Sequence, residues 1–200
     1  MRAEPNRKTN RKNSDSATTE VEQADIELGK KIASKRHHPA VKAAAKAGKL
    51  GDQGPLYALS SGILIVGVAA RDRRVTDCAL AMLAAIAAAD LGKRIVKRLV
   101  RRTRPHVLLD HGHYDADTGG SGDKEEQSFP SGHTACTVAA ARALSRHFPE
   151  TIAAAGAATA AIGLSRIAEG KHWPLDVAAG AVIGLAAEKL AAVIYERCSQ

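Results

Sequence analysis

The chain has 200 residues, of which 45% are hydrophobic and only 3% aromatic, so alanine must fill much of any core. Lys and Arg number 29 against 21 Asp and Glu, giving a net charge of +8. This balance excludes an acidic, solvating chain and favours an anionic partner, namely a nucleic acid, a membrane surface or a phosphate.

The first 50 residues read as a basic arm. They hold 12 Lys or Arg and 6 Asp or Glu, so +6 of the net charge of +8 lies there. Residues 1–20 lack apolar periodicity and are expected to be disordered. Residues 21–50 carry a thin apolar stripe, which fits a helix on an anionic membrane surface or a solvated arm equally well. We therefore divide the chain into a basic arm at 1–50 and a helical bundle at 51–200.

Five apolar segments follow a turn cluster at 51–55. None shows strand-like alternation and each is rich in Ala and Leu, so the predicted fold class is all-α. A membrane span needs about 20 mostly apolar residues, and the uncharged runs are shorter. Basic clusters between the runs and recurring glycines nevertheless favour a membrane bundle over a soluble one. We predict a membrane helical bundle of about five helices, at 56–70, 75–91, 134–144, 152–164 and 177–187.

A run of cations, KRLVRRTRP, follows the second apolar segment. On a continuous helix, Lys97, Arg101 and Arg104 would point to one place, and Pro105 would end the helix. Because guanidinium groups bind phosphate oxygens bidentately, this face is a candidate phosphate site. A juxtamembrane cluster that only sets topology is the simpler explanation of this run alone.

A second segment, SFPSGH, precedes an Ala-rich helix. Ser131 is the expected N-cap, and a helix N-terminus binds anions through its free N–H groups. Gly132 lets a ligand approach the backbone, and His133 would stand beside a bound anion, able to give a proton. By itself, the segment is also explained as an ordinary capped helix start.

A third segment joins Arg166 to His172 and Asp176. The two last residues are four apart, a spacing at which a carboxylate can reach a ring nitrogen and leave the other nitrogen as nucleophile or base. Pro174 fits the first turn of a helix, and Arg166 can return a guanidinium to the same place. A helix–turn–helix with a surface histidine is the alternative for this segment alone.

Together, the three segments resemble the three signatures of the type 2 phosphatidic acid phosphatase superfamily. They match in order, spacing and identity as Lys97-x6-Arg104-Pro105, Pro130-Ser131-Gly132-His133 and Ser165-Arg166-x5-His172-x3-Asp176. That superfamily includes membrane lipid phosphatases, soluble bacterial acid phosphatases and vanadium haloperoxidases. The resemblance covers about residues 55–196, and the first 50 residues fall outside it.

The resemblance implies a phosphatase that works through a phosphohistidine, with no metal and no cofactor. It assigns His172 as the nucleophile, Asp176 as its orienting carboxylate, and His133 as the acid that protonates the leaving alkoxide and then activates water. It assigns the phosphate ligands as Lys97, Arg104 and Arg166, with Ser131 and the Gly132 N–H as further donors. Such a set supplies positioning and charge neutralisation, which are the main work in phosphoryl transfer.

We therefore expect a membrane enzyme that hydrolyses a phosphatidate, a polyprenyl monophosphate or diphosphate, or a similar lipid. Its partners are then the membrane and the lipid phosphate, and no nucleic acid. The alternatives are a vanadate-dependent, haloperoxidase-like enzyme, a soluble non-specific acid phosphatase, and a non-enzymatic basic membrane protein. The short length and the apolar helices argue against the haloperoxidase, and three complete motifs argue against coincidence.

The loop between the first two motifs is rich in potential metal ligands. They are His106, Asp110, His111, His113, Asp115 and Asp117, and their spacing matches no defensible zinc pattern. The loop could instead moderate the basic pocket or contact a substrate headgroup.

The arrangement of five helices predicts the side of the membrane. It places the N-terminus and the motifs on one side and the C-terminus on the other. The basic excess at 1–50 and 93–104 predicts that the motif side is the cytoplasmic face of the inner membrane. Many members of the resembled family place their site on the outer face, so both faces stay open.

Overall fold

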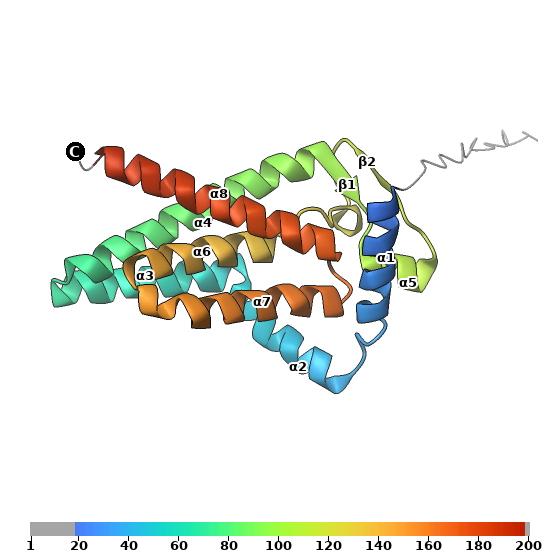
Figure 1. The fold of residues 1–200 in the computed structure, drawn as a ribbon, viewed down its shortest axis with the longest axis horizontal. Coiled ribbons are helices and arrows are strands. Elements are labelled where there is room, and N and C mark those ends of the chain that lie inside the picture. The colour runs from blue at the N-terminus through green and yellow to red at the C-terminus, as the bar shows by residue number, and fades with distance from the viewer. Residues whose placement is uncertain (1–18, 199–200) are drawn as a thin grey trace, which may run out of the picture.

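The structure is a computed structural model that describes residues 19–198. The disorder expected for residues 1–20 therefore falls, except for its last two residues, outside the described part. Within residues 19–198 the chain forms eight α-helices and one two-stranded antiparallel sheet (Figure 1). In chain order these are α1 (Glu20–Ala33), α2 (Pro39–Gly48), α3 (Gln53–Ala70), α4 (Arg73–Leu99), β1 (Val100–Arg102), α5 (Pro105–His111), β2 (Ala116–Thr118), α6 (Gly132–His147), α7 (Ile152–Ala168) and α8 (Pro174–Cys198).

All five helices of the predicted bundle are present, as α3, α4, α6, α7 and α8. The prediction of about five helices is too low for the described chain, because α1, α2 and α5 raise the number to eight. Two of these lie in the segment expected to be an arm, and the third is a short helix begun by Pro105. The bundle itself is helical throughout, and only the two three-residue strands depart from the all-α class.

The core is built from small side chains on α4 and α6. Ala85 and Ala139 are fully buried there, and Met82 and Ile86 add the larger volumes. Such small residues bring helix axes close together. A Cβ added to Gly184 on α8, for example, would lie 2.5 Å from the carbonyl oxygen of Ala135 on α6. Figure 1 shows α6 lying among α4, α7 and α8, which pack against it.

Within residues 19–198, four helical segments are long and apolar enough to cross a membrane. They are α3, α4, the segment Pro149–Ala168 that contains α7, and α8. Their outer faces expose large apolar side chains such as Ile65, Leu164 and Val182, as expected for contact with lipid. The central α6 has only 16 residues, and its neighbours shield it.

The cation run of the first motif is not one helix. The helix α4 ends at Leu99, β1 follows it, and Pro105 begins α5 instead of ending a helix. The prediction that Lys97, Arg101 and Arg104 share one helical face is therefore wrong. In β1, the backbone N–H and C=O groups pair with the antiparallel strand β2, whereas in a helix they would pair within the same segment. Because β2 is distant in the chain, the local sequence of the first motif does not reveal this pairing.

Alternation along β1 separates two neighbouring arginines. Arg101 turns outward, where it forms ion pairs with Asp115 and Asp117. Arg102 turns inward and is only 5% exposed. A strand sends successive side chains to opposite faces, so this single change of element decides which arginine reaches the interior.

The helix α1 lies across one end of the bundle, and the C-terminal end of α8 lies at the opposite end (Figure 1). Thr19 caps α1 by accepting from the Glu22 N–H, and the helix buries Asp25, Gly29 and Ala33. The helix α2 packs on α7. This part of the expected arm is thus packed on the protein, which differs from both a solvated arm and a helix lying only on lipid. The division of the chain at residue 50 into two domains remains a prediction.

Candidate active site

The three motifs meet around one cavity at the end of the bundle that α1 crosses. The cavity measures about 300 Å³. It lies among the starts of α3 and α6, the end of α4, the residue before α5 and the loop before α8. The residues that line it are Asp52, Gln53, Lys93, Lys97, Arg104, Gly132, His133, Lys171 and His172. Four of these nine residues are Lys or Arg and one is an Asp, so the cavity is suited to an anion.

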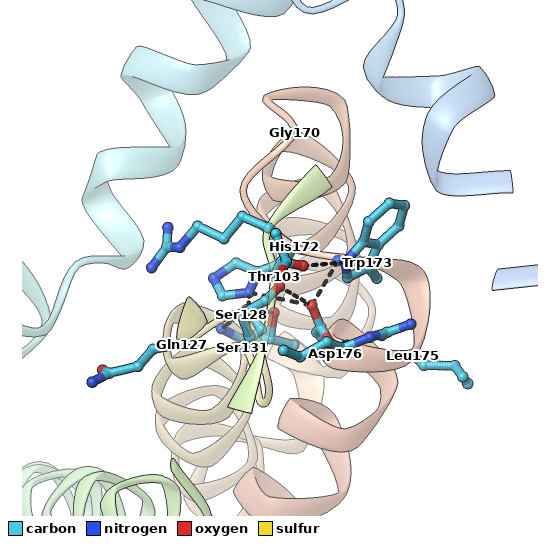
Figure 2. A network of polar contacts seen from close by, with 12 residues as sticks. Thr103, Gln127, Ser128, Ser131, Gly170, His172, Trp173, Leu175 and Asp176 are labelled. Atoms are coloured by element: carbon cyan, nitrogen blue, oxygen red, sulfur yellow. Dashed lines mark hydrogen bonds and ion pairs between the residues drawn. The ribbon is translucent and has the colours of Figure 1, made fainter. Parts of the chain in front are cut away.

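His172 is held by a main-chain carbonyl. Its Nδ1 lies 2.7 Å from the Ser128 oxygen and 3.8 Å from Asp176 Oδ2 (Figure 2). Because a carbonyl only accepts, we assign the ring proton to Nδ1, which leaves the Nε2 lone pair free. The carboxylate expected to orient the ring directly is therefore outside hydrogen-bond distance, and the carbonyl takes that place.

The ring of His172 is neutral in this environment. Burial lowers the pKa of His172 below its usual range. The neighbouring Arg104 and Lys97 lower it further, while Asp176 opposes them. A neutral imidazole with a free Nε2 is the form required of a nucleophile.

Asp176 organises the backbone around His172. It is fully buried on the first turn of α8. One oxygen accepts from Arg102 Nη1 at 2.9 Å, and the other from the Trp173 N–H at 2.7 Å and from the Ser128 hydroxyl (Figure 2). Because Ser128 also presents the carbonyl that binds His172, Asp176 reaches the ring through Ser128.

His133 lies in the first turn of α6, and its Nε2 contacts the Asp52 carboxylate. Burial lowers the pKa of His133 to about 4. Arg166 also lowers this pKa, whereas Asp52 raises it. Asp52 precedes α3, so a residue of the turn cluster at 51–55 faces the imidazole of the second motif.

Lys97 and Arg104 both line the cavity, although no single helix carries them. Lys97 Nζ donates to the Gln127 carbonyl at 2.5 Å, and Arg104 Nε donates to the Lys124 carbonyl at 2.9 Å. Both acceptors belong to the loop before α6. The cations are thus held by backbone oxygens, and the predicted convergence of these two residues is present by another route.

The three remaining predicted ligands differ in placement. Gly132 lines the cavity at the start of α6. The Ser131 hydroxyl accepts from the Thr134 N–H at 3.5 Å, which confirms the predicted N-cap, but it does not line the cavity. Arg166 donates to the Gly48 carbonyl at 2.7 Å, and its Nη2 lies 3.9 Å from Asp52. As phosphate ligands, all five residues stay predictions, and Ser131 and Arg166 also lie outside the cavity lining.

The sequence matches the model of a known protein family. The family model of the PAP2 superfamily matches residues 78–199. The chain belongs to the PAP2 superfamily. The resemblance that the motifs indicated is thereby confirmed.

Individual PAP2 relatives agree with this assignment. The lipid A 1-phosphatase of Rhizobium etli is 36% identical over 104 residues, which are 52% of this chain and 44% of that protein. The chain spans less than half the length of the curated relatives it matches. Among solved structures, Aquifex aeolicus LpxE has a TM-score of 0.58 at 26% identity and covers 83% of this chain and 93% of its own.

A second solved structure shares the fold. It is the transmembrane PAP2 type phosphatidylglycerolphosphate phosphatase of Bacillus subtilis, with a TM-score of 0.63 at 23% identity, covering 90% of this chain and 88% of its own. Together with the four apolar helices, this fold supports a multi-pass membrane protein.

Several residues of the PAP2 site were not singled out from the sequence. Lys93 lies one turn before Lys97 on α4, so its i, i+4 spacing could have indicated it. Trp173 is the only tryptophan of the chain, and its Nε1 donates to the Thr103 carbonyl at 2.8 Å. Asp52 and Arg102 gave no local signal, because their partners lie more than 70 residues away.

The loop between the first two motifs carries no metal cluster in this structure. Its His106 lies between the Gly170 carbonyl and Glu125, and its Asp110 pairs with Arg36. Across residues 19–198, no three His, Cys, Asp or Glu side chains gather as metal ligands. Acidic side chains of the loop instead pair with Arg36 and Arg101, which do not line the cavity. A role of the loop in moderating the basic pocket or contacting a headgroup stays a prediction.

Proposed function

We propose that this chain is a membrane phosphatase that hydrolyses a lipid phosphate or a polyprenyl phosphate or diphosphate through a phosphohistidine. The observation that carries the proposal is a neutral His172, held at Nδ1, in a cavity that also contains Lys97, Arg104 and His133. The cavity lies at the end of a bundle of apolar helices, where a lipid headgroup would meet it. The relatives named lipid A 1-phosphatase support a lipid phosphate as substrate.

In the first step, the phosphate occupies the cavity between Lys97, Arg104 and the N-terminus of α6. The Nε2 lone pair of His172 attacks phosphorus, and the bond from phosphorus to the ester oxygen breaks. His133 gives its proton to the departing oxygen. The positive charge that develops on His172 is stabilised by Asp176, 3.8 Å from Nδ1.

In the second step, His133 is neutral and takes a proton from a water molecule. The water oxygen bonds to phosphorus, and the phosphorus–nitrogen bond breaks, returning its electron pair to Nε2 of His172. Inorganic phosphate leaves, and both histidines regain their starting forms. Ser131 and Arg166 would add donors to the phosphate in both steps.

A substrate panel tests the proposal. The protein in detergent is given phosphatidate, polyprenyl phosphate, polyprenyl diphosphate, a phosphorylated glycolipid and soluble p-nitrophenyl phosphate, and phosphate release is measured. We expect kcat/KM to be higher for at least one lipid than for the soluble ester. Equal values on all esters would favour a non-specific acid phosphatase. Peroxide-dependent bromide oxidation with vanadate, without phosphate release, would favour the haloperoxidase-like alternative.

Chelation tests the absence of a metal requirement. We expect EDTA to leave the rate of phosphate release unchanged, because Lys97, Arg104, Lys93 and Lys171 already neutralise a bound phosphate. Vanadate should inhibit as a phosphate mimic. Loss of activity in EDTA that a divalent ion restores would contradict this prediction and reopen the loop at 106–117 as a metal site.

The pH dependence follows from His133. A general acid must be protonated, so kcat/KM should fall as the pH rises through the pKa of His133. That pKa is about 4 in the free enzyme, which is below the usual 6.5 of an imidazole. Asp52 raises this pKa, so the Asp52→Asn variant should move the falling limb to still lower pH. The profile is measured with an alkyl phosphate under subsaturating conditions. A limb that stays in place, or moves upward, would show that Asp52 does not act on the titrating group.

We also propose that the site faces the cytoplasm in the inner membrane. The reason is that the basic segments 1–50 and 93–104 are expected on the side of the membrane that carries the motifs. Exposed His113 lies at the same end, and Cys78 and Cys136 are buried. A His113→Cys variant in a Cys198→Ser background should react with a membrane-impermeant maleimide only after cells are permeabilised. Labelling of intact cells would place the site on the outer face.

A further inference from the structure

The helix α1 reaches the catalytic residues although it lies outside the PAP2 match at 78–199. Its Asp25 is only 5% exposed. One carboxylate oxygen accepts from Arg102 Nη2 at 2.7 Å, and the other accepts from the Leu175 N–H at 2.8 Å. Asp25 therefore binds both a buried arginine and the first turn of α8, which carries Asp176.

Arg102 continues the connection inward. Its guanidinium bridges two carboxylates, with Nη2 on Asp25 and Nη1 on Asp176 at 2.9 Å. Burial opposes the charged form, but Asp176 and then Tyr114 and Asp25 hold the pKa of Arg102 above its usual value. The arginine thus stays charged, and it needs both acceptors because an unpaired buried charge is costly.

The end of the connection is the nucleophile. Asp176 accepts from the Ser128 hydroxyl, and the Ser128 carbonyl accepts from His172 Nδ1 at 2.7 Å (Figure 2). All five side chains of this connection are buried, so few alternative partners can replace a lost contact. They are Asp25, Arg102, Asp176, Ser128 and His172. Water cannot readily compensate at these positions.

Close packing fixes α1 against the same group of residues. A Cβ added to Gly29 would lie 2.4 Å from Cε3 of Trp173, so only glycine lets the helix approach this near. On the same helix, Glu22 accepts from the Tyr114 hydroxyl, which itself accepts from Arg102 Nε at 3.0 Å. Three residues of α1 thus contact the residues that surround His172.

We propose that Asp25 is a positioning residue of the active site, which fixes Asp176 through Arg102 and the start of α8, and thereby the ring of His172. This inference rests on the proposed phosphatase function. Asp25 does not line the cavity, so it acts only through other residues. The helix α1 is then a functional part of the catalytic centre instead of a dispensable arm.

The position of Asp25 predicts which kinetic constant changes. Phosphate binding depends on Lys97 and Arg104, and neither contacts Asp25. Displacement of a nucleophile by a fraction of an ångström, in contrast, lowers the rate of the chemical step. Loss of the Asp25 carboxylate should therefore lower kcat and leave KM nearly unchanged.

The main test compares two isosteric changes on α1. Asp25→Asn should lower kcat by about 10- to 100-fold and keep KM within about threefold of wild type. Glu27→Gln removes the same charge from an exposed position of the same helix, and it should keep kcat within about twofold. Asp25→Glu, which keeps the charge, should recover part of the lost kcat.

Counting active sites separates positioning from loss of folded protein. The amount of vanadate bound per protein gives the fraction of intact sites, and kcat is expressed per vanadate-binding site. We expect unchanged binding with a lower kcat per site. A proportional fall in binding and kcat, with normal kcat per site, would overturn the proposal in favour of a purely structural role.

A second variant covers the case in which Asp25→Asn does not fold. Gly29→Ala leaves every charge in place but forces α1 away from Trp173, so kcat per site should fall as well. If kcat per site stays within twofold of wild type in each variant that folds, the proposal is overturned. Failure of the proposed function looks different, because the wild-type protein would then release no phosphate from any ester.

Discussion

Replacing His172 with alanine should lower the turnover of every phosphate ester by more than about 100-fold and abolish the acid-labile phosphoenzyme. The reason is that the chain loses the Nε2 atom that bonds to phosphorus. The cations of the cavity remain, so vanadate should still bind. Two quantities are measured. One is the rate of phosphate release, and the other is the amount of labelled phosphate bound to the protein that acid removes and base does not.

The control for this prediction is His111→Ala, because His111 is exposed on α5 and does not line the cavity. It should retain the wild-type rate and the phosphoenzyme. A His172→Ala variant that keeps more than about one hundredth of the wild-type turnover would show that the covalent role belongs to another group.

Replacing His133 with alanine should separate substrates by their leaving groups. An alkyl phosphate needs a proton on the departing oxygen, so its hydrolysis should fall by about 100- to 10,000-fold. The p-nitrophenolate ion departs without a proton, so the first step with p-nitrophenyl phosphate should survive. Because His133 also activates water in the second step, phosphoenzyme should accumulate with this ester.

Rapid-quench measurements check both parts of the prediction. The burst of p-nitrophenol reports the first step, and the slow phase reports hydrolysis of the phosphohistidine. An equal loss of rate for both leaving groups, without phosphoenzyme, would show that His133 holds phosphate instead of transferring a proton. The His111→Ala variant again serves as the control, since it removes an imidazole outside the cavity.

The predicted residues reach the site by routes that local patterns did not reveal. The spacing predicts Lys97 and Arg104 on one helical face, yet the strand β1 lies between the end of α4 and Arg104, which precedes α5. They converge because the end of α4 and the start of α5 meet at one end of the bundle. That these two residues lie in one site was thus predictable, while the geometry that unites them was not.

The contact predicted for His172 also differs from the one in the structure. Its spacing from Asp176 predicted a direct contact, because residues four apart share a helix face. However, His172 precedes α8 and is not part of that helix, so the spacing rule does not hold for it. The Ser128 carbonyl lies 44 residues away in the chain and fills the place that the carboxylate was expected to occupy.

The sequence by itself determined the helical class, the apolar segments of the bundle, the N-cap at Ser131, the first-turn position of Pro174, and the three motifs that identify the family. These features depend on composition and on neighbours within a few residues, which a linear pattern records. Only the tertiary structure decided that Arg102 faces inward, that Asp52 meets His133, and that α1 brings Asp25 to the catalytic centre. Each of these contacts joins residues more than 70 positions apart, and its geometry depends on how whole helices pack, which no local pattern contains.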